Sequence, residues 1–248
     1  MAGRFVYWMN VSLDLFIERE VGEHGDIGGP SWIRLGEPLH REFNARARAL
    51  AMMVQGRKVY EMMDPFWPNA RTDESLPGFL REYGEIWTDK PKVLVSRTRT
   101  TAEHNTRIIG DDNAIEQLAV LRQETDGEIG IGGANLATQL MRAHLLDELW
   151  LFTHPVVLGA DRQLFDALDQ PLELDLLEQD SFDQGVTMHR YAVRGARGTL
   201  GVTLWALTAI SSRTVPWRRS RRTAWWGSRS SSTRRHCLRR WDRCQPTL

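Results

Sequence analysis

Residues 129–159 have the sequence IGIGGANLATQLMRAHLLDELWLFTHPVVLG, and the fold prediction depends on this stretch. Together with the preceding Glu128, its first residues up to Ile131 predict a short buried strand that stops at Gly132-Gly133. Ala134 to His144 has helical spacing, and Glu148 to Thr153 predicts a second strand. A strand, a helix and another strand in succession are typical of parallel pairing in an α/β sheet.

The sequence on both sides of this stretch continues the alternation. Further strands are predicted at residues 5–11, 51–55, 92–96, 105–109 and 186–193. Helices are predicted at 37–50, 58–63, 76–87 and 114–122, the last with Asp111 or Asp112 as its N-cap, and 66–77 is predicted as mostly loop. Residues 156–158 and 172–179 have extended character. We therefore expect an α/β fold, with a mainly parallel central sheet, flanking helices and an antiparallel closing section.

The charge distribution divides the 248 residues into two parts. Residues 1–196 contain 20 Lys and Arg against 31 Asp and Glu, whereas residues 197–248 contain 12 Arg and one acid. The formal net charge of zero therefore conceals an acidic part of −11 and a basic part of +11. We expect one folded domain over 1–196, followed by a disordered tail over 197–248 that is rich in Arg, Ser and Trp.

Two interpretations of the tail remain open. A basic, aromatic arm is suited to bind phosphate backbones and bases of nucleic acid. The other interpretation, which we favour, is that the tail has no evolved task, since this composition is what a GC-rich gene gives when read out of frame. Cys237 and Cys244 lie near His236 without a second ligand pair, so we expect no metal site.

The cysteine content and the apolar runs indicate where the protein is located. Both cysteines lie in the tail, so no disulfide framework holds residues 1–196 together, and a reducing cytoplasm is the expected location. The longest apolar run, Leu200 to Ile210, is far shorter than the roughly 20 residues of a membrane span, so no membrane partner is expected. Asn10, Ser12 and Asp14 interrupt the first strand region, which is not typical of a signal peptide.

Three predicted strands end in residues suited to anions. Ile131 is followed by Gly132-Gly133-Ala134-Asn135-Leu136, a turn whose free backbone N–H groups and helix dipole favour a pyrophosphate. Gly56-Arg57 follows the second strand, and Ser96-Arg97-Thr98 follows the third. Guanidinium and hydroxyl groups match phosphate oxygens. Because the carboxyl ends of parallel strands meet at one edge, a dinucleotide with an additional phosphate is the expected ligand, although no G-x-G-x-x-G motif is present.

A fourth candidate, Asp14, follows Ser12-Leu13 where the first strand ends. Its carboxylate has two equally weighted interpretations. It either anchors or protonates a nitrogen heterocycle at the site, or it caps a turn.

The order of YWMNVSLDLFIE, MMVQGRKVYEMM, FWP, KPKVLVSRT and the opening stretch resembles the dihydrofolate reductase-like superfamily. It is most similar to stand-alone bacterial relatives of the riboflavin-biosynthesis reductase domain (RibD C-terminal type). The resemblance covers residues 4 to 194, and the tail has no counterpart in that family.

This resemblance implies an NADPH-dependent oxidoreductase that passes a hydride to a small heterocycle, for example a phosphoribosylamino-pyrimidine of the riboflavin pathway. Arg57, Ser96, Arg97 and Thr98 would contact the ribose phosphate. Asp14 would be the catalytic candidate beside the nicotinamide. Gly132, Gly133, Ala134, Asn135 and Leu136 would hold the pyrophosphate. The resemblance also implies a homodimer.

Three positions depart from the family pattern. Leu15 stands where Gly follows Ser-x-Asp, Val59 replaces a Thr, and Asp161 replaces a Gly. If the position of Leu15 needs a left-handed backbone, a bulky residue there costs about 1–2 kcal/mol.

The sequence is also compatible with two other functions. A true dihydrofolate reductase would need an acid on the first helix, and Glu37 is the candidate there. The second is a non-catalytic nucleotide-binding or regulatory protein. It would bind cofactor without turnover and use the basic tail on nucleic acid.

Overall fold

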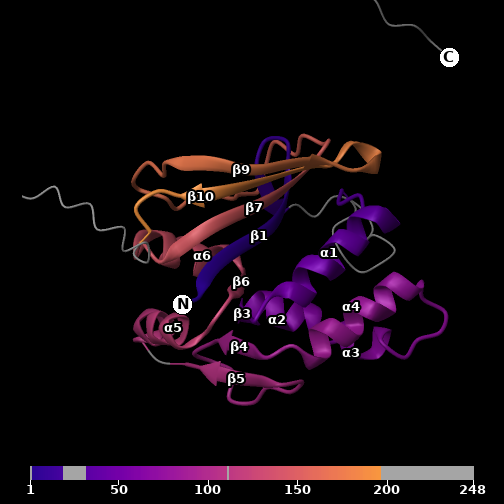
Figure 1. Ribbon diagram of the computed structural model, residues 1–248, viewed down its shortest axis with the longest axis horizontal. Coiled ribbons are helices and arrows are strands. Elements are labelled where there is room, and N and C mark those ends of the chain that lie inside the picture. The colour runs from indigo at the N-terminus through magenta and orange to yellow at the C-terminus, as the bar shows by residue number, and fades with distance from the viewer. Residues whose placement is uncertain (1, 19–31, 111, 197–248) are drawn as a thin grey trace, which may run out of the picture. The chain divides into compact units, whose positions relative to one another are not determined.

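The computed structural model describes residues 2–18, 32–110 and 112–196. The tail prediction for 197–248 and one of the two proposed N-caps, Asp111, lie outside these ranges. Eight strands form one sheet in the order β5-β4-β3-β6-β1-β7-β10-β9, drawn in Figure 1. Their bounds are β1 Arg4–Ser12, β3 Met52–Gly56, β4 Lys92–Val95, β5 Thr106–Ile109, β6 Glu128–Gly132, β7 Leu146–His154, β9 Leu174–Ser181 and β10 Thr187–Val193.

The sheet is parallel from β5 to β7 and antiparallel at its far edge. β6 pairs in parallel with β1 and β3, and β1 also pairs in parallel with β7. β10 then runs antiparallel to both β7 and β9. A separate two-stranded ribbon joins β2 (Phe16–Glu18) to β8 (Arg162–Gln163). The predicted α/β fold with an antiparallel closing section is confirmed.

Helices cover both faces of the sheet (Figure 1). Alternate side chains of β1 enter different cores, because Phe5 and Tyr7 pack with α5 and α6 whereas Val6 packs with α1. A third cluster joins α1 and α4 around Trp87. The helices are α1 Glu37–Ala49, α2 Arg57–Met63, α3 Trp67–Ala70, α4 Gly78–Asp89, α5 Ala114–Glu124 and α6 Ala134–Arg142, with a short 3₁₀ turn at Asp183–Gly185.

The local predictions were wrong at a few positions. α3 is a four-residue helix inside the predicted loop, with Pro68 in its first turn, where the missing N–H has no cost. α4 begins at Gly78 instead of residue 76, because Pro77 is its extended N-cap. α5 has Asn113 as its N-cap instead of either aspartate. β2 was not predicted.

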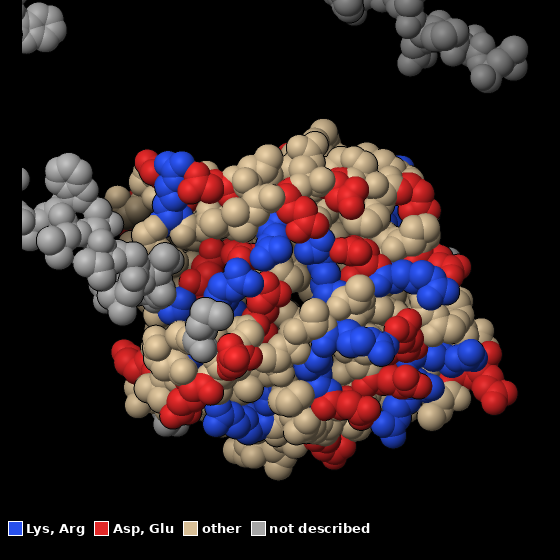
Figure 2. Space-filling model, viewed as in Figure 1, with Lys and Arg blue, Asp and Glu red and all other residues tan. Residues whose placement is uncertain are grey.

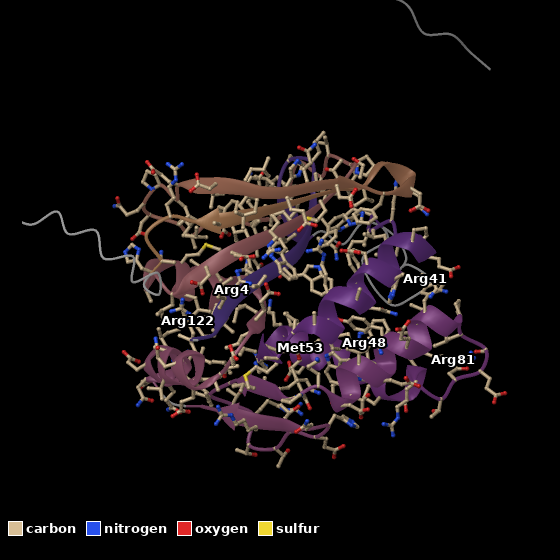
Figure 3. All side chains as sticks on the ribbon, in the orientation of Figure 1. Arg4, Arg41, Arg48, Met53, Arg81 and Arg122 are labelled. Atoms are coloured by element: carbon tan, nitrogen blue, oxygen red, sulfur yellow. The ribbon has the colours of Figure 1, made fainter. Side chains whose placement is uncertain are left out.

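A network of ion pairs joins β1 to the strands on both sides of it. The carboxylate of Glu148 is buried and accepts hydrogen bonds from Arg4 Nη1 (2.8 Å), Arg190 Nε (2.6 Å) and the indole Nε1 of Trp150 (2.9 Å). Arg4 and Arg190 also reach Glu128 on β6. Arg4 lies near the start of β1 in Figure 3. Strands β1, β6, β7 and β10 are therefore joined through charged groups as well as through the backbone ladder.

We expect Glu148→Ala to lower the free energy of unfolding by about 3 kcal/mol. The change leaves the indole N–H of Trp150 without its acceptor, and it removes the carboxylate that the guanidinium groups of Arg4 and Arg190 share. Urea unfolding followed by circular dichroism measures this. Asp175→Ala is the matched control, since it breaks the exposed pair with Arg194 and should cost much less. Equal losses in the two variants would contradict this account.

The described fold closes with β10, and Arg194 is anchored by its backbone N–H donating to Glu173 O (3.0 Å) and by its side chain pairing with Asp175. We therefore predict that a chain of residues 1–196 folds with an unchanged thermal midpoint. Differential scanning calorimetry of the full and shortened chains tests this prediction. A drop of several degrees on shortening would show that residues 197–248 stabilise the domain.

Candidate cofactor edge and substrate cavity

The turn between β6 and α6 has the backbone geometry that an approaching anion needs. Gly133 has φ of 110°, a conformation that residues with a side chain rarely adopt. It precedes α6, whose first N–H groups, at Ala134, Asn135 and Leu136, have no acceptor within the helix. The turn thus presents backbone donors and the positive end of the α6 dipole at the carboxyl edge of the sheet.

The turn between β3 and α2 lies directly against it. A Cβ at Gly133 would lie 3.7 Å from the Cα of Gly56 and 3.6 Å from Cγ2 of Val59. Val59 therefore presents methyl groups to the glycine turn. Since β3 pairs with β4 on its other side, the strand order brings all three predicted strand ends to one edge.

The cations at this edge differ from the expected set. Arg57 Nη1 lies 3.6 Å from Oε2 of Glu61, and Arg99 Nη1 lies 3.8 Å from Oε1 of the same carboxylate. Glu61 thus holds Arg57 and Arg99 as neighbours. The side chain of Arg97 is 81% exposed and lies 4.0 Å from Asp112. Arg99 was not predicted as a site residue, although the alternating arginines of SRTRT indicate a second cation in this loop.

Ser96 and Thr98 have different surroundings. Ser96 is buried, and its Oγ accepts the backbone N–H of Thr98 (3.3 Å) and of Arg99 (3.1 Å). The Ser96 hydroxyl therefore shapes the loop after β4 and holds Arg99 in place, whereas Thr98 is exposed at the edge.

A further cation reaches the β6–α6 turn from β8. Arg162 Nη2 donates to Oδ1 of Asn135 (2.6 Å), and its Nη1 lies 3.5 Å from Glu18. This arginine was also missed, because only the β2–β8 ribbon brings it beside α6.

Asp14 closes the loop between β1 and β2. Its Oδ1 accepts from Ser12 Oγ (2.6 Å) and the Leu158 N–H (3.1 Å), and its Oδ2 accepts from the Gly159 N–H (2.8 Å). Desolvation acts to raise the pKa of Asp14, but these hydrogen bonds outweigh it and lower the pKa to about 2. The next residue, Leu15, has φ of 63°, so the position does require a left-handed backbone. These contacts favour the turn-capping interpretation of Asp14.

A cavity of about 300 Å³ lies between the sheet and helices α1 to α4, next to the glycine turn. Met53, labelled in Figure 3, lies in its wall. The other lining residues are mostly aromatic or apolar: Trp8, Met9, Asn10, Leu35, His40, Phe43, Leu50, Gln55, Val59, Met62, Met63, Phe66, Trp67, Tyr83, Gly130, Ile131, Gly132 and Gly133.

Other features of the surface are less suited to a ligand. A hollow of about 430 Å³ is lined by Pro91, His104 and Arg107, but it lies at the amino ends of β4 and β5, away from the glycine turn. Figure 2 shows acidic and basic side chains intermixed over the face in view. Within the described ranges, no three His, Cys, Asp or Glu side chains could together hold a metal ion, and no helix is long and apolar enough to cross a membrane.

Comparisons with solved structures agree with this architecture. A putative riboflavin biosynthesis protein from Shewanella sp. PV-4 superposes with a TM-score of 0.55 at 20% identity, covering 78% of this chain and 99% of that one. Dihydrofolate reductase from Enterococcus faecalis gives 0.52 at 14% identity, with 78% and 98% covered. RibD from Acinetobacter baumannii gives 0.52 at 16% identity over 77% of this chain and 58% of its own. At these identities the likeness shows a shared fold.

Comparisons of sequence show the family. The uncharacterized protein YyaP of Bacillus subtilis (strain 168) is 28% identical over 193 residues, which cover 77% of this chain and 96% of that protein. The family model described as the RibD C-terminal domain matches residues 5–188, which include both strand–helix turns and most of the antiparallel section. The chain therefore belongs to the RibD C-terminal domain family, with a dihydrofolate reductase-like fold.

Proposed function

We propose that this protein is an NADPH-dependent reductase of a small heterocyclic substrate. One observation carries the proposal: the glycine turn after β6, the cationic turn after β3 and the aromatic cavity all adjoin one another. The free N–H groups of α6 fit a pyrophosphate, and Arg57 with Arg99 fits a second phosphate. Bound NADPH would supply a hydride to a C=N or C=O carbon of the substrate.

Known relatives support this proposal at the level of the family. The dihydrofolate reductase of similar fold was solved in complex with NADP(H), and the Shewanella protein is described as a riboflavin biosynthesis protein. Reduction of a phosphoribosylamino-pyrimidine is therefore one candidate reaction. We also propose that the protein forms a homodimer through the section from β9 to β10, where Leu176 and Leu177 are exposed. We further propose a cytoplasmic location.

The role of Asp14 in this function is to hold the loop beside the reaction centre. A carboxyl group with a pKa near 2 is ionised at neutral pH and is a poor proton donor. Two of its hydrogen bonds instead tie the β1–β2 loop to Leu158 and Gly159, and the third accepts from Ser12 in the same loop. We therefore assign proton delivery to water.

The two other candidate functions receive less support. Glu37, the acid that a true dihydrofolate reductase would use, is exposed and paired with Arg41 (2.6 Å), and it does not line the cavity. A non-catalytic nucleotide-binding protein would not need a cavity beside the glycine turn. NADPH oxidation with dihydrofolate, or binding without any turnover, would favour these alternatives respectively.

We expect NADPH to bind at least about tenfold more tightly than NADH, because NADH lacks the 2′-phosphate that the guanidinium groups match. Each charge-assisted hydrogen bond contributes about 1.5–3 kcal/mol, and solvent exposure at this edge reduces that contribution. Arg57→Ala and Arg99→Ala should weaken NADPH and leave NADH nearly unchanged, because these two arginines share Glu61 at the proposed phosphate site. Isothermal titration with both nucleotides measures this.

Arg41→Ala is the matched control for these variants, since Arg41 lies on α1 in an exposed pair with Glu37. Equal affinity of the unaltered protein for the two nucleotides would overturn the site assignment.

Gly133→Ala should instead weaken NADPH and NADH by a similar factor, because both contain the pyrophosphate that the turn would hold and a side chain at φ of 110° distorts the turn. Gly195→Ala is the control, since Gly195 also has a positive φ of 78° but lies in open space. A change in the affinity of one nucleotide alone would contradict this role for Gly133.

A further inference from the structure

One carboxylate at the cofactor edge is shared between two arginines. Glu61 lies one helical turn after Arg57 on α2, and its Oε2 is 3.6 Å from Arg57 Nη1. Its Oε1 is 3.8 Å from Nη1 of Arg99, which lies in the loop after β4. The two cations come from different elements, and Glu61 neutralises part of the positive charge on which a phosphate at this edge would depend.

Neither of these ion pairs is a hydrogen bond. Both N–O distances exceed the range of about 2.7–3.2 Å that is typical of N–H···O hydrogen bonds. The side chains of Arg57, Glu61 and Arg99 are 49%, 36% and 34% exposed, so water screens both pairs and they contribute little to the stability of the fold. The guanidinium groups therefore keep the capacity to bind another anion in better geometry.

Arg99 has anchors other than Glu61. Its backbone N–H donates to Oγ of Ser96 (3.1 Å), and its guanidinium carbon lies 5.7 Å from the centre of the Tyr60 ring, which is fully buried. The backbone of Arg57 is fixed as well, because this residue begins α2 directly after β3 ends. We therefore expect both cations to stay at this edge when the charge of Glu61 is removed.

A phosphate and the Glu61 carboxylate compete for the same two guanidinium groups. The carboxylate already faces both of them, so a phosphate that contacts Arg57 and Arg99 must lie against it or displace it. Like charges at contact repel, and they repel more strongly near a protein surface than in bulk water. An unphosphorylated ribose has no such charge, and its hydroxyl groups can donate to a carboxylate. Glu61 therefore acts against the phosphorylated nucleotide alone.

We propose that Glu61 is a specificity-determining residue, whose carboxylate competes with the ribose phosphate of the cofactor for Arg57 and Arg99. This competition makes the site selective for a phosphate that is part of a nucleotide. A free phosphate ion has to displace the carboxylate unaided, whereas a phosphate on a nucleotide held at the glycine turn acts at a high effective concentration. The proposal deepens the reductase function and rests on it for the position of the phosphate.

The test compares two nucleotide fragments that lack the nicotinamide, so no reduction step enters the measurement. Adenosine 2′,5′-bisphosphate has the ribose phosphate, and adenosine 5′-monophosphate lacks it. Isothermal titration of the full-length protein and of its Glu61→Gln variant measures both affinities. Glutamine keeps the size of the side chain and removes only its charge. We expect Glu61→Gln to bind the bisphosphate at least about fivefold more tightly, and the monophosphate with an affinity within about twofold of the original.

Glu37→Gln is the matched control, because it makes the same change of net charge in another exposed i,i+4 pair with an arginine, on α1. It should leave both affinities unchanged. If the unaltered protein prefers the bisphosphate and this preference does not rise in Glu61→Gln, the inference alone is overturned, as it is by equal tightening of both fragments. If neither protein distinguishes the two fragments, or neither binds them, the phosphate site is absent and the proposed function fails with it.

Two further measurements test how Glu61 acts. In an Arg99→Ala background, Glu61→Gln should tighten the bisphosphate by about twofold or less, because one of the two contested cations is missing. A full gain there would refute competition for Arg99. Inorganic phosphate should raise the thermal midpoint of Glu61→Gln more than that of the unaltered protein, with sodium chloride at equal ionic strength as the reference. Equal shifts would refute the exclusion of free phosphate by Glu61.

Discussion

The arrangement of both sites depends on the absence of side chains on one face of β6. Gly130 and Gly132 face the helices α1 and α2 from a central strand of the sheet. A Cβ at Gly130 would lie 2.5 Å from Cδ1 of Leu50, and one at Gly132 would lie 3.2 Å from Cγ1 of Val59. Side chains at these two positions would push away the end of α1 and the start of α2. The glycines therefore set the distance between the cationic turn, the glycine turn and the cavity.

The two ends of the parallel strands have opposite characters. Near the amino ends, charged groups are paired with one another, as in the Arg4–Glu148 contact and in the pair of Arg122 with Asp147. Figure 3 places Arg4 and Arg122 close to the same end of β1. At the carboxyl ends, Oε1 of Gln55 is buried without a hydrogen-bond partner among the described residues, and Gly133 has a backbone conformation that residues with a side chain rarely adopt. An unsatisfied buried polar atom costs stability and is typical of functional sites, and the paired end helps to offset this cost.

Much of the fold was predictable because its signals are local. Apolar runs located β1, β3, β4 and β6, and the Gly132-Gly133 pair located the start of α6. The meeting of the candidate anion-binding turns at one edge was predicted from the family resemblance and from the general rule for parallel strands, whereas the strand order was not predicted. The short β2 and α3 lack a periodic pattern, because three or four residues are too few to show one.

The polar groups of the cavity could not be found in the same way. His40 and Asn44 are one helical turn apart, but the tautomer of His40 is set by Glu82 and the Phe79 carbonyl from α4. The orientation of Asn10 depends on His154, which is 144 residues away in the chain. Contacts of this kind arise only when distant elements pack together, so a single sequence shows the residues without their roles.

The separation of the cavity wall from the cofactor edge has a consequence for divergence within the family. Helices α1, α3 and α4 supply Phe43, Trp67 and Tyr83 to the wall, whereas the turns after β3, β4 and β6 supply the groups proposed to bind anions. Substitutions on those helices can therefore alter the shape of the cavity without moving the glycine turn. A lineage built on this scaffold can change its cavity while the turns proposed for the cofactor stay the same.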